Sequence, residues 1–124
     1  MDVYTRHINQ FQHNKDFLNY GISNERKKFS DWEITVNFYA AVHLIEAVMS
    51  SECGINEIRT HDERQDKMEE NREVFSPVLT LYFKLKTLAR TARYCGIVDV
   101  NEKDSRQAQT YLEDIEFGLR KYIR

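Results

Sequence analysis

The residues best suited to chemistry in this sequence are three cations and a neighbouring aromatic side chain. Lys86, Arg90 and Arg93 follow one another at steps of four and three residues, and Tyr94 comes directly after them. Residues at these steps share one face of a helix, so the three charges would form one ridge. Arginine binds phosphate or carboxylate through two parallel hydrogen bonds, and an aromatic ring can stack on a base. The pattern predicts a binding site for an anion such as an RNA or nucleotide phosphate.

A second interpretation of this ridge is purely structural. Its cations would then be internal and pair with acidic side chains of the last predicted helix, for which the candidates are Asp104, Glu113 and Glu116. Because arginine and lysine pair with carboxylates as readily as with phosphates, residue types alone leave both interpretations open.

His43, His61 and Arg64 are further candidates for a site. His43 lies inside an apolar run, where an imidazole needs a hydrogen-bond partner or a polar cavity, so it is either a core histidine bonded to a neighbouring helix or part of a site. His61 and Arg64 are three residues apart at a predicted helix start, which suits an anionic ligand but also suits a solvated surface. If the chain is an enzyme, His43 and His61 are the candidate catalytic acid or base.

Signatures of common enzymes and metal sites are absent from the sequence. It contains no GxSxG, no glycine-rich phosphate loop, no HExxH and no paired ExxH motif. The four histidines are not spaced like metal ligands along the chain, and His61-Asp62 alone supplies too few. We therefore expect no metal and no cofactor.

Helices are predicted to position all of these residues, because apolar residues recur at steps of three and four and no useful strand-like alternation appears. The predicted helix starts are Ser30 and Thr60, each with a capping box to the glutamate three residues on, Ser76 with Pro77 in the first turn, and Asp99 or Asn101. The predicted ends are Gly21, Gly54 and Gly96, while Gly118 falls inside a helix. The fold class is all-α: one domain over residues 1–124, a four-helix up-and-down bundle with one short charged helix across its end.

The same spacing predicts the core. The helix from residue 30 has two apolar faces and should be central. One face is Ile34, Phe38, Ala41, Ile45 and Val48, and the other is Trp32, Val36, Tyr39, Ala40, His43 and Ala47. Single stripes are predicted elsewhere: Tyr4, Ile8, Phe11 and Leu18; Val78, Tyr82, Leu85, Leu88 or Ala89, and Ala92; Ala108, Leu112, Ile115, Leu119 and Tyr122.

Composition narrows the class of protein. A net charge of −2, with 41% hydrophobic and 31% charged residues, excludes a polybasic arm or an acidic tail, so any nucleic-acid site must be a local patch. The first residues lack a signal-peptide pattern and no apolar run reaches the roughly 18 residues of a membrane span, so we expect a cytoplasmic protein without a membrane partner. Cys53 and Cys95 form no CxxC pair and are expected to be reduced and structural.

Three runs of the sequence resemble the HEPN superfamily. They begin at residues 31, 60 and 88 and read DWEITVNFYAAVH, THDER and LARTARY, and the similarity spans roughly residues 13 to 122. The resemblance implies a helical domain that often dimerises and acts in RNA cleavage or nucleotide binding, in defence, toxin and stress systems of prokaryotes or phages.

The chain departs from the ribonucleolytic members of that superfamily. These carry an arginine, four to six residues and then a histidine on a late helix, whereas no histidine follows Arg90 or Arg93, and the one match, Arg6 to His13, lies in the first predicted helix. The resemblance therefore implies a non-catalytic, homodimeric module for RNA, a nucleotide or an acidic protein partner. Its binding residues would be His43, His61, Arg64, Lys86, Arg90, Arg93 and Tyr94. The alternatives are an atypical metal-independent ribonuclease or nucleotide-modifying enzyme, and a structural subunit of a larger assembly.

Overall fold

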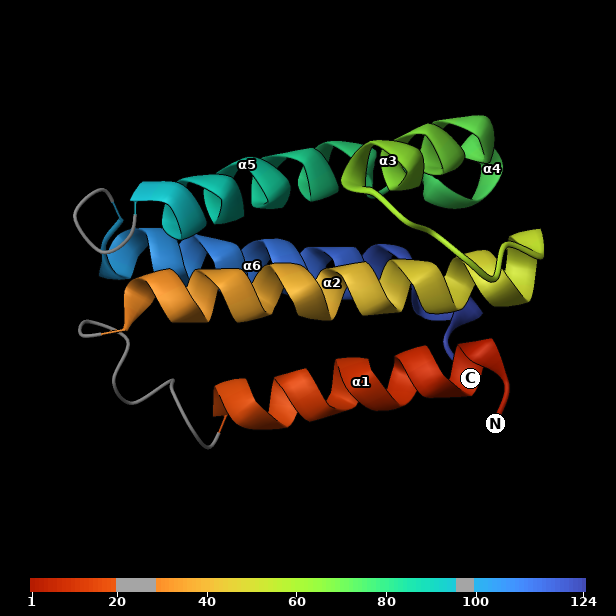
Figure 1. Cartoon of the computed structure of the whole chain (residues 1–124), viewed down its shortest axis with the longest axis horizontal. Coiled ribbons are helices and arrows are strands. Elements are labelled where there is room, and N and C mark those ends of the chain that lie inside the picture. Colours follow the sequence, from red (N-terminus) through yellow and green to blue (C-terminus); the bar gives the residue numbers. More distant parts are fainter. Residues whose placement is uncertain (20–28, 96–99) are drawn as a thin grey trace.

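The computed structural model describes residues 1–19, 29–95 and 100–124, and this part of the chain is helical and without strands (Figure 1). Its elements are α1 Val3–Phe17, α2 Ser30–Cys53, α3 His61–Glu70, α4 Arg72–Phe75, α5 Leu79–Cys95, α6 Glu102–Gly118 and the short 3-10 helix η4 Arg120–Tyr122. The prediction of an all-α chain is confirmed. The single turn α4 was not predicted.

Helix α2 is the core of the fold. It packs against α1 on one side and against α5 and α6 on the other, and α5 also packs on α6 (Figure 1). The first predicted face of α2, from Ile34 to Val48, is completely buried. The second is only partly covered: Ala40 and Ala47 are buried, whereas Trp32 is 59% and Tyr39 36% exposed. The helix is central, as predicted, but the packed helices leave the strip with Trp32 and Tyr39 uncovered.

By length and composition alone, α2 could cross a membrane. An 18-residue window of this helix has a mean hydropathy of 1.2, so the expectation that no apolar run is long enough was too strict. Within the structure, however, 61% of that window is buried. Most of its apolar surface faces the other helices, as expected for the central helix of a packed domain.

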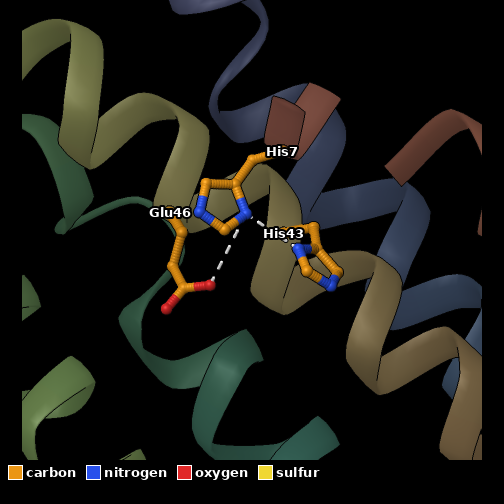
Figure 2. Close-up of side chains that lie close together, drawn as sticks. All are labelled: His7, His43 and Glu46. Carbon is orange, nitrogen blue, oxygen red and sulfur yellow. Dashed lines mark hydrogen bonds and ion pairs between the residues drawn. The ribbon is translucent and has the colours of Figure 1, made fainter. Parts of the chain in front are cut away.

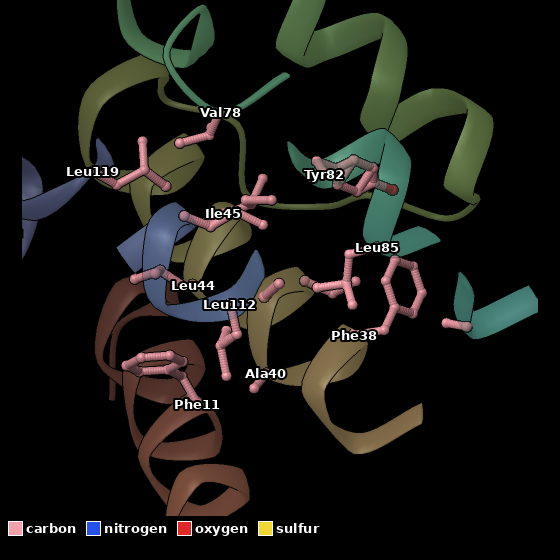
Figure 3. Packing of buried hydrophobic residues seen from close by; sticks show 14 of the residues in the cluster. Phe11, Phe38, Ala40, Leu44, Ile45, Val78, Tyr82, Leu85, Leu112 and Leu119 are labelled. Carbon is pink, nitrogen blue, oxygen red and sulfur yellow. The ribbon is translucent and has the colours of Figure 1, made fainter. Parts of the chain in front are cut away.

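The core residues come from all four long helices. Figure 3 shows Phe11 of α1, Leu44 and Ile45 of α2, Tyr82 of α5 and Leu112 of α6 converging on one cluster. The predicted stripes are buried as expected, with Ala89 rather than Leu88 as the buried member of its pair, while Ile8, Leu88 and Tyr122 lie partly buried at the edge. The three-and-four spacing therefore identified the packed faces.

Three of the predicted helix boundaries are observed with a capping hydrogen bond. Asn101 and Asp104 form a complete capping box at the start of α6, with bonds of 3.0 and 3.1 Å, and Gly54 ends α2 in the left-handed conformation with φ 69°. Thr60 caps α3, but the Glu63 carboxylate accepts from the Arg59 amide instead of closing the predicted box. The predicted boundaries at Gly21, Gly96 and Asp99 lie outside the described residues.

One predicted boundary, at Ser76, is wrong. The predicted start at Ser30 is observed, with Phe29 instead of Ser30 in the cap position. Ser76 ends α4 instead of starting α5, which begins three residues later at Leu79. The intervening turn buries Val78 against Gly118, the last residue of α6, where an added Cβ would lie 2.5 Å from the Val78 Cγ1 atom. Tertiary packing at this point overrides the local Ser-Pro signal.

Candidate functional site

An open pocket of about 390 Å³ lies between the start of α3 and the second half of α5. We call it the α3–α5 pocket, and its lining residues are Thr60, His61, Asp62, Lys86, Arg90, Arg93 and Tyr94. Five of the seven binding residues predicted from the sequence therefore gather around it. The other two, His43 and Arg64, do not line it.

The cations of the pocket are not neutralised by α6, so the interpretation of an internal, paired ridge is wrong. Lys86 bonds to Gln65 at 3.2 Å and lies 3.9 Å from Asp62, whose side chain is 96% exposed. An exposed pair of this kind contributes about 0–1 kcal/mol. In the described part of the chain, Arg90 and Arg93 make no ion pair, and Arg90 is exposed.

The acidic side chains proposed as partners of the ridge have other partners. Glu116 pairs with Lys15 of α1 at 2.6 Å, Glu113 accepts a bond from Gln109, and Asp104 belongs to the capping box of its own helix. The charge of the pocket is therefore three cations against the one carboxylate of Asp62. This arrangement favours an anion.

The guanidinium of Arg93 lies among three aromatic rings. Its Cζ atom lies 5.6 Å from the centroid of Phe38, 5.9 Å from that of Tyr39 and 5.8 Å from that of Tyr94. Such cation–π contacts stabilise a guanidinium by about 0.5–1 kcal/mol each at exposed sites. Its Nη1 atom is buried and has no hydrogen-bond partner among the described residues. Arg93 lines the pocket, so its charge adds to the field that attracts an anionic ligand.

Arg64 lies beneath the pocket and is only 6% exposed. Its Nη1 atom donates to His61 Nδ1 at 2.7 Å and to the Tyr82 hydroxyl at 3.3 Å, and its Nη2 atom donates to Glu46 Oε1 at 3.4 Å. The solvated interpretation of Arg64 is therefore wrong. Its guanidinium is committed to protein acceptors, so it positions His61 instead of reaching the pocket.

The protonation of His61 follows from this contact. A guanidinium can only donate, so His61 Nδ1 accepts and the ring carries its proton on Nε2. Burial lowers the pKa of His61, as do Arg64, Arg93 and Lys86, while Asp62 opposes them. His61 is therefore a neutral imidazole at pH 7, with Arg64 fixing its tautomer.

His43 is bonded to the neighbouring helix, which was one of the two interpretations of this residue. Its Nδ1 atom lies 2.8 Å from Nδ1 of His7 on α1, and Glu46 Oε2 is 3.8 Å from that same His7 atom (Figure 2). Burial lowers the pKa of His43 to about 4, with His7 and Arg64 adding to the effect. Burial also lowers the pKa of His7, and the Glu46 carboxylate opposes it.

His7 and Glu46 were not singled out from the sequence, although a signal for each exists. His7 is three residues after Tyr4 and four before Phe11, so it lies on the apolar face of α1, and Glu46 is one helical turn from His43. A polar residue on a core-facing stripe needs a partner. Which partner it meets depends on how α1 is placed against α2, and helical spacing does not contain that information.

Comparison with protein-family models, with curated proteins and with solved structures gives no match. The resemblance to the HEPN superfamily therefore rests on the sequence motifs alone.

A second cavity, of about 180 Å³, lies between α1, α2 and α6. Charged side chains around it include Lys15, Glu33, Glu113 and Glu116, and the Lys15–Glu116 pair lies at its wall. Its acidic lining makes it unsuited to an anion. The α3–α5 pocket is the better candidate site for a phosphate.

Cys53 is a free thiol near the end of α2. Burial raises its pKa, and Glu73 and Glu52 add to the effect, so it is a protonated thiol at neutral pH. This agrees with the reduced, structural role expected for it. The side chain of Cys95 lies outside the described part of the structure.

Proposed function

We propose that this chain is a non-catalytic, HEPN-like binding module whose α3–α5 pocket binds phosphate groups of RNA or of a nucleotide. The observation that carries the proposal is the convergence of Lys86, Arg90 and Arg93 on one open pocket, with Asp62 as its one lining carboxylate. These cations do not pair with the acidic side chains of α6, so their positive charge can attract an anionic ligand.

The pocket offers each kind of contact that a single-stranded nucleic acid uses. Arg90 is exposed and can bind a phosphate through two hydrogen bonds, and Arg93 adds a second positive charge to the lining. Tyr94 is 78% exposed at the pocket wall and provides a face on which a base can stack. The neutral His61 adds one N–H donor.

The geometry favours binding over cleavage. Cleavage of RNA without metal needs one group to take the proton of the 2′-hydroxyl and another to protonate the leaving oxygen. His61 is the one histidine at the pocket, and His43 is bonded to His7 outside its lining. The lining of the α3–α5 pocket therefore offers one imidazole and not the pair that such a reaction would use, which supports a binding role.

The proposal includes the finer architecture implied by the resemblance. The four long helices would form a HEPN-type up-and-down bundle, and two copies would pair through the uncovered strip of α2 that carries Trp32 and Tyr39. The chain would act as a homodimer in a defence or toxin system. Sedimentation over a wide concentration range tests the dimer, and a constant monomer mass contradicts it.

The binding site is tested with a fluorescent single-stranded RNA oligonucleotide in an anisotropy titration at several salt concentrations. Each phosphate contact on a single strand contributes about 0.7 to the slope of log K against log salt, so an Arg90→Gln, Arg93→Gln variant should lower that slope by about 1.4. A matched variant, Lys84→Gln with Lys103→Gln, removes the same charge from exposed positions outside the pocket and should change the slope little.

Equal effects of the two double variants would contradict the proposed site. The same samples, run on a denaturing gel, test the enzyme alternative. RNA that stays intact agrees with a binding module, whereas cleavage that is lost on His61→Ala would replace the proposal by the ribonuclease alternative. No RNA binding by the parent protein would also refute the proposal and direct attention to an acidic protein partner.

A further inference from the structure

Three potential metal ligands lie together where α1 packs on α2, away from the lining of the α3–α5 pocket. They are His7 of α1 with His43 and Glu46 of α2, and one ligand atom from each lies within 4.8 Å of the other two (Figure 2). His7 Nδ1 is 2.8 Å from His43 Nδ1 and 3.8 Å from Glu46 Oε2. Ligand atoms of all three side chains therefore surround one small volume.

The spacing of these atoms suits a first-row divalent ion. A zinc ion with bonds of about 2.0–2.1 Å holds two ligand atoms about 3.3 Å apart at the tetrahedral angle. The two observed separations of 2.8 and 3.8 Å bracket that value. The third separation, between His43 and Glu46, is within 4.8 Å, so side-chain adjustments of about 1–1.5 Å would bring the three ligand atoms to an ion.

The donor set is also one that divalent transition metals use. Two imidazoles with one carboxylate are the protein ligands of His₂Glu zinc sites, and a related set binds non-haem iron. All three side chains are at least partly buried, which limits competition from water. Arg64 holds the other oxygen of Glu46, Oε1, at 3.4 Å and so fixes the carboxylate, in the manner of the outer partners that orient metal ligands.

We infer that His7, His43 and Glu46 form a three-ligand site for a divalent transition metal of the zinc type, with the remaining coordination position open to water or a small ligand. The ion would join α1 to α2, the helix against which α1 chiefly packs. None of these three ligands lines the α3–α5 pocket, so the metal site is independent of the proposed phosphate site.

The test uses the purified full chain, freed of metal by dialysis against a chelator. Zn²⁺ is titrated in competition with a chromogenic zinc indicator, and we expect one ion per chain. Changing even an outer partner of a metal ligand lowers affinity about 10–100-fold, so His7→Gln and His43→Gln should each lower it by at least that factor. The matched control is His13→Gln, because His13 is an exposed histidine on the same helix, outside the cluster.

A second readout reports the ligands directly. Co²⁺ in place of Zn²⁺ should give the strong visible absorption of a site with fewer than six ligands, and this absorption should be lost in His7→Gln but kept in His13→Gln. Circular dichroism identifies any variant that has unfolded, and the partly exposed His7 provides the decisive variant if His43→Gln does not fold.

Three results would overturn the inference: no Zn²⁺ binding, equal loss in His7→Gln and His13→Gln, or unchanged binding in both His7→Gln and His43→Gln. The variant Arg90→Gln, Arg93→Gln should bind Zn²⁺ like the parent protein. It therefore separates a failure of the metal site from a failure of the proposed phosphate site.

Discussion

Replacing Arg64 by methionine should destabilise the fold far more than replacing an exposed arginine. Arg64 is 6% exposed, and its Nη2 atom lies 3.4 Å from a Glu46 carboxylate whose side chain is 11% exposed. Methionine keeps most of the side-chain volume but removes the positive charge. The Glu46 carboxylate would then be left in a poorly hydrated environment, with His7 at 3.8 Å as its nearest basic neighbour.

The magnitude follows from this burial. Breaking a buried ion pair by removing one partner costs about 3–5 kcal/mol, because an uncompensated charge remains inside the protein. Removing Arg64 also takes the donor from the Tyr82 hydroxyl and from His61, which adds to the loss. For a domain of this size each kcal/mol lowers Tm by about 4 °C, so we expect a fall of about 12–20 °C.

Thermal and guanidinium unfolding followed by circular dichroism measures this loss, with Arg59→Met as the matched control. Arg59 pairs with Glu57 at 3.1 Å, but their side chains are 77% and 72% exposed, so that pair should contribute about 0–1 kcal/mol. Adding Glu46→Gln to Arg64→Met removes the stranded charge and should recover part of the loss. A cost for Arg64→Met no larger than that of Arg59→Met would refute the reasoning.

Two further predictions concern packing and pH. Gly118→Ala would place a Cβ 2.5 Å from Val78 Cγ1 and should cost about 1–3 kcal/mol in denaturant unfolding; the cost should shrink in a Val78→Ala background, and an equal cost in both backgrounds would contradict the clash. Burial and nearby cations lower the pKa of His61 below its ordinary 6.5. As the pH falls, His61 is therefore protonated in the unfolded chain at a higher pH than in the folded chain. The stability contributed by neutral His61 is present above about pH 6.5 and is lost as the pH falls. His61→Gln should therefore lose less stability than the parent between about pH 7.5 and about pH 5.5, and an identical loss would contradict this assignment.

Helical periodicity predicted the parts of the fold that depend on local sequence. The stripes from Tyr4, Val78 and Ala108 onward are buried because residues at steps of three and four lie on one helical face whatever surrounds the helix. Asn101 could likewise be predicted, since a cap bonds to an amide three residues away. The failure at Ser76 has the opposite cause, because the fit of Val78 onto Gly118 joins residues about 40 positions apart in the sequence.

In the candidate site too, features set by one helix could be predicted and contacts between helices could not. Lys86, Arg90 and Arg93 share one ridge because they share one helix, and all three line the α3–α5 pocket. The environment of Arg64 could not be predicted, because its acceptor Glu46 is 18 residues away on a different helix. The pairing of His7 with His43 spans 36 residues and is likewise fixed by the packing of α1 on α2.

Arg64 connects the two candidate sites that this packing produces. At one end its Nη1 donor fixes the tautomer of His61 in the α3–α5 pocket, and at the other its Nη2 donor orients Glu46 beside His7. Because a guanidinium is planar and only donates, each acceptor must present a lone pair in a defined direction. Burying that charge requires several acceptors, and the Nε atom of Arg64 still has no partner among the described residues. Removing Arg64 would therefore free both His61 and Glu46 from their fixed orientations, so a single substitution should perturb both candidate sites.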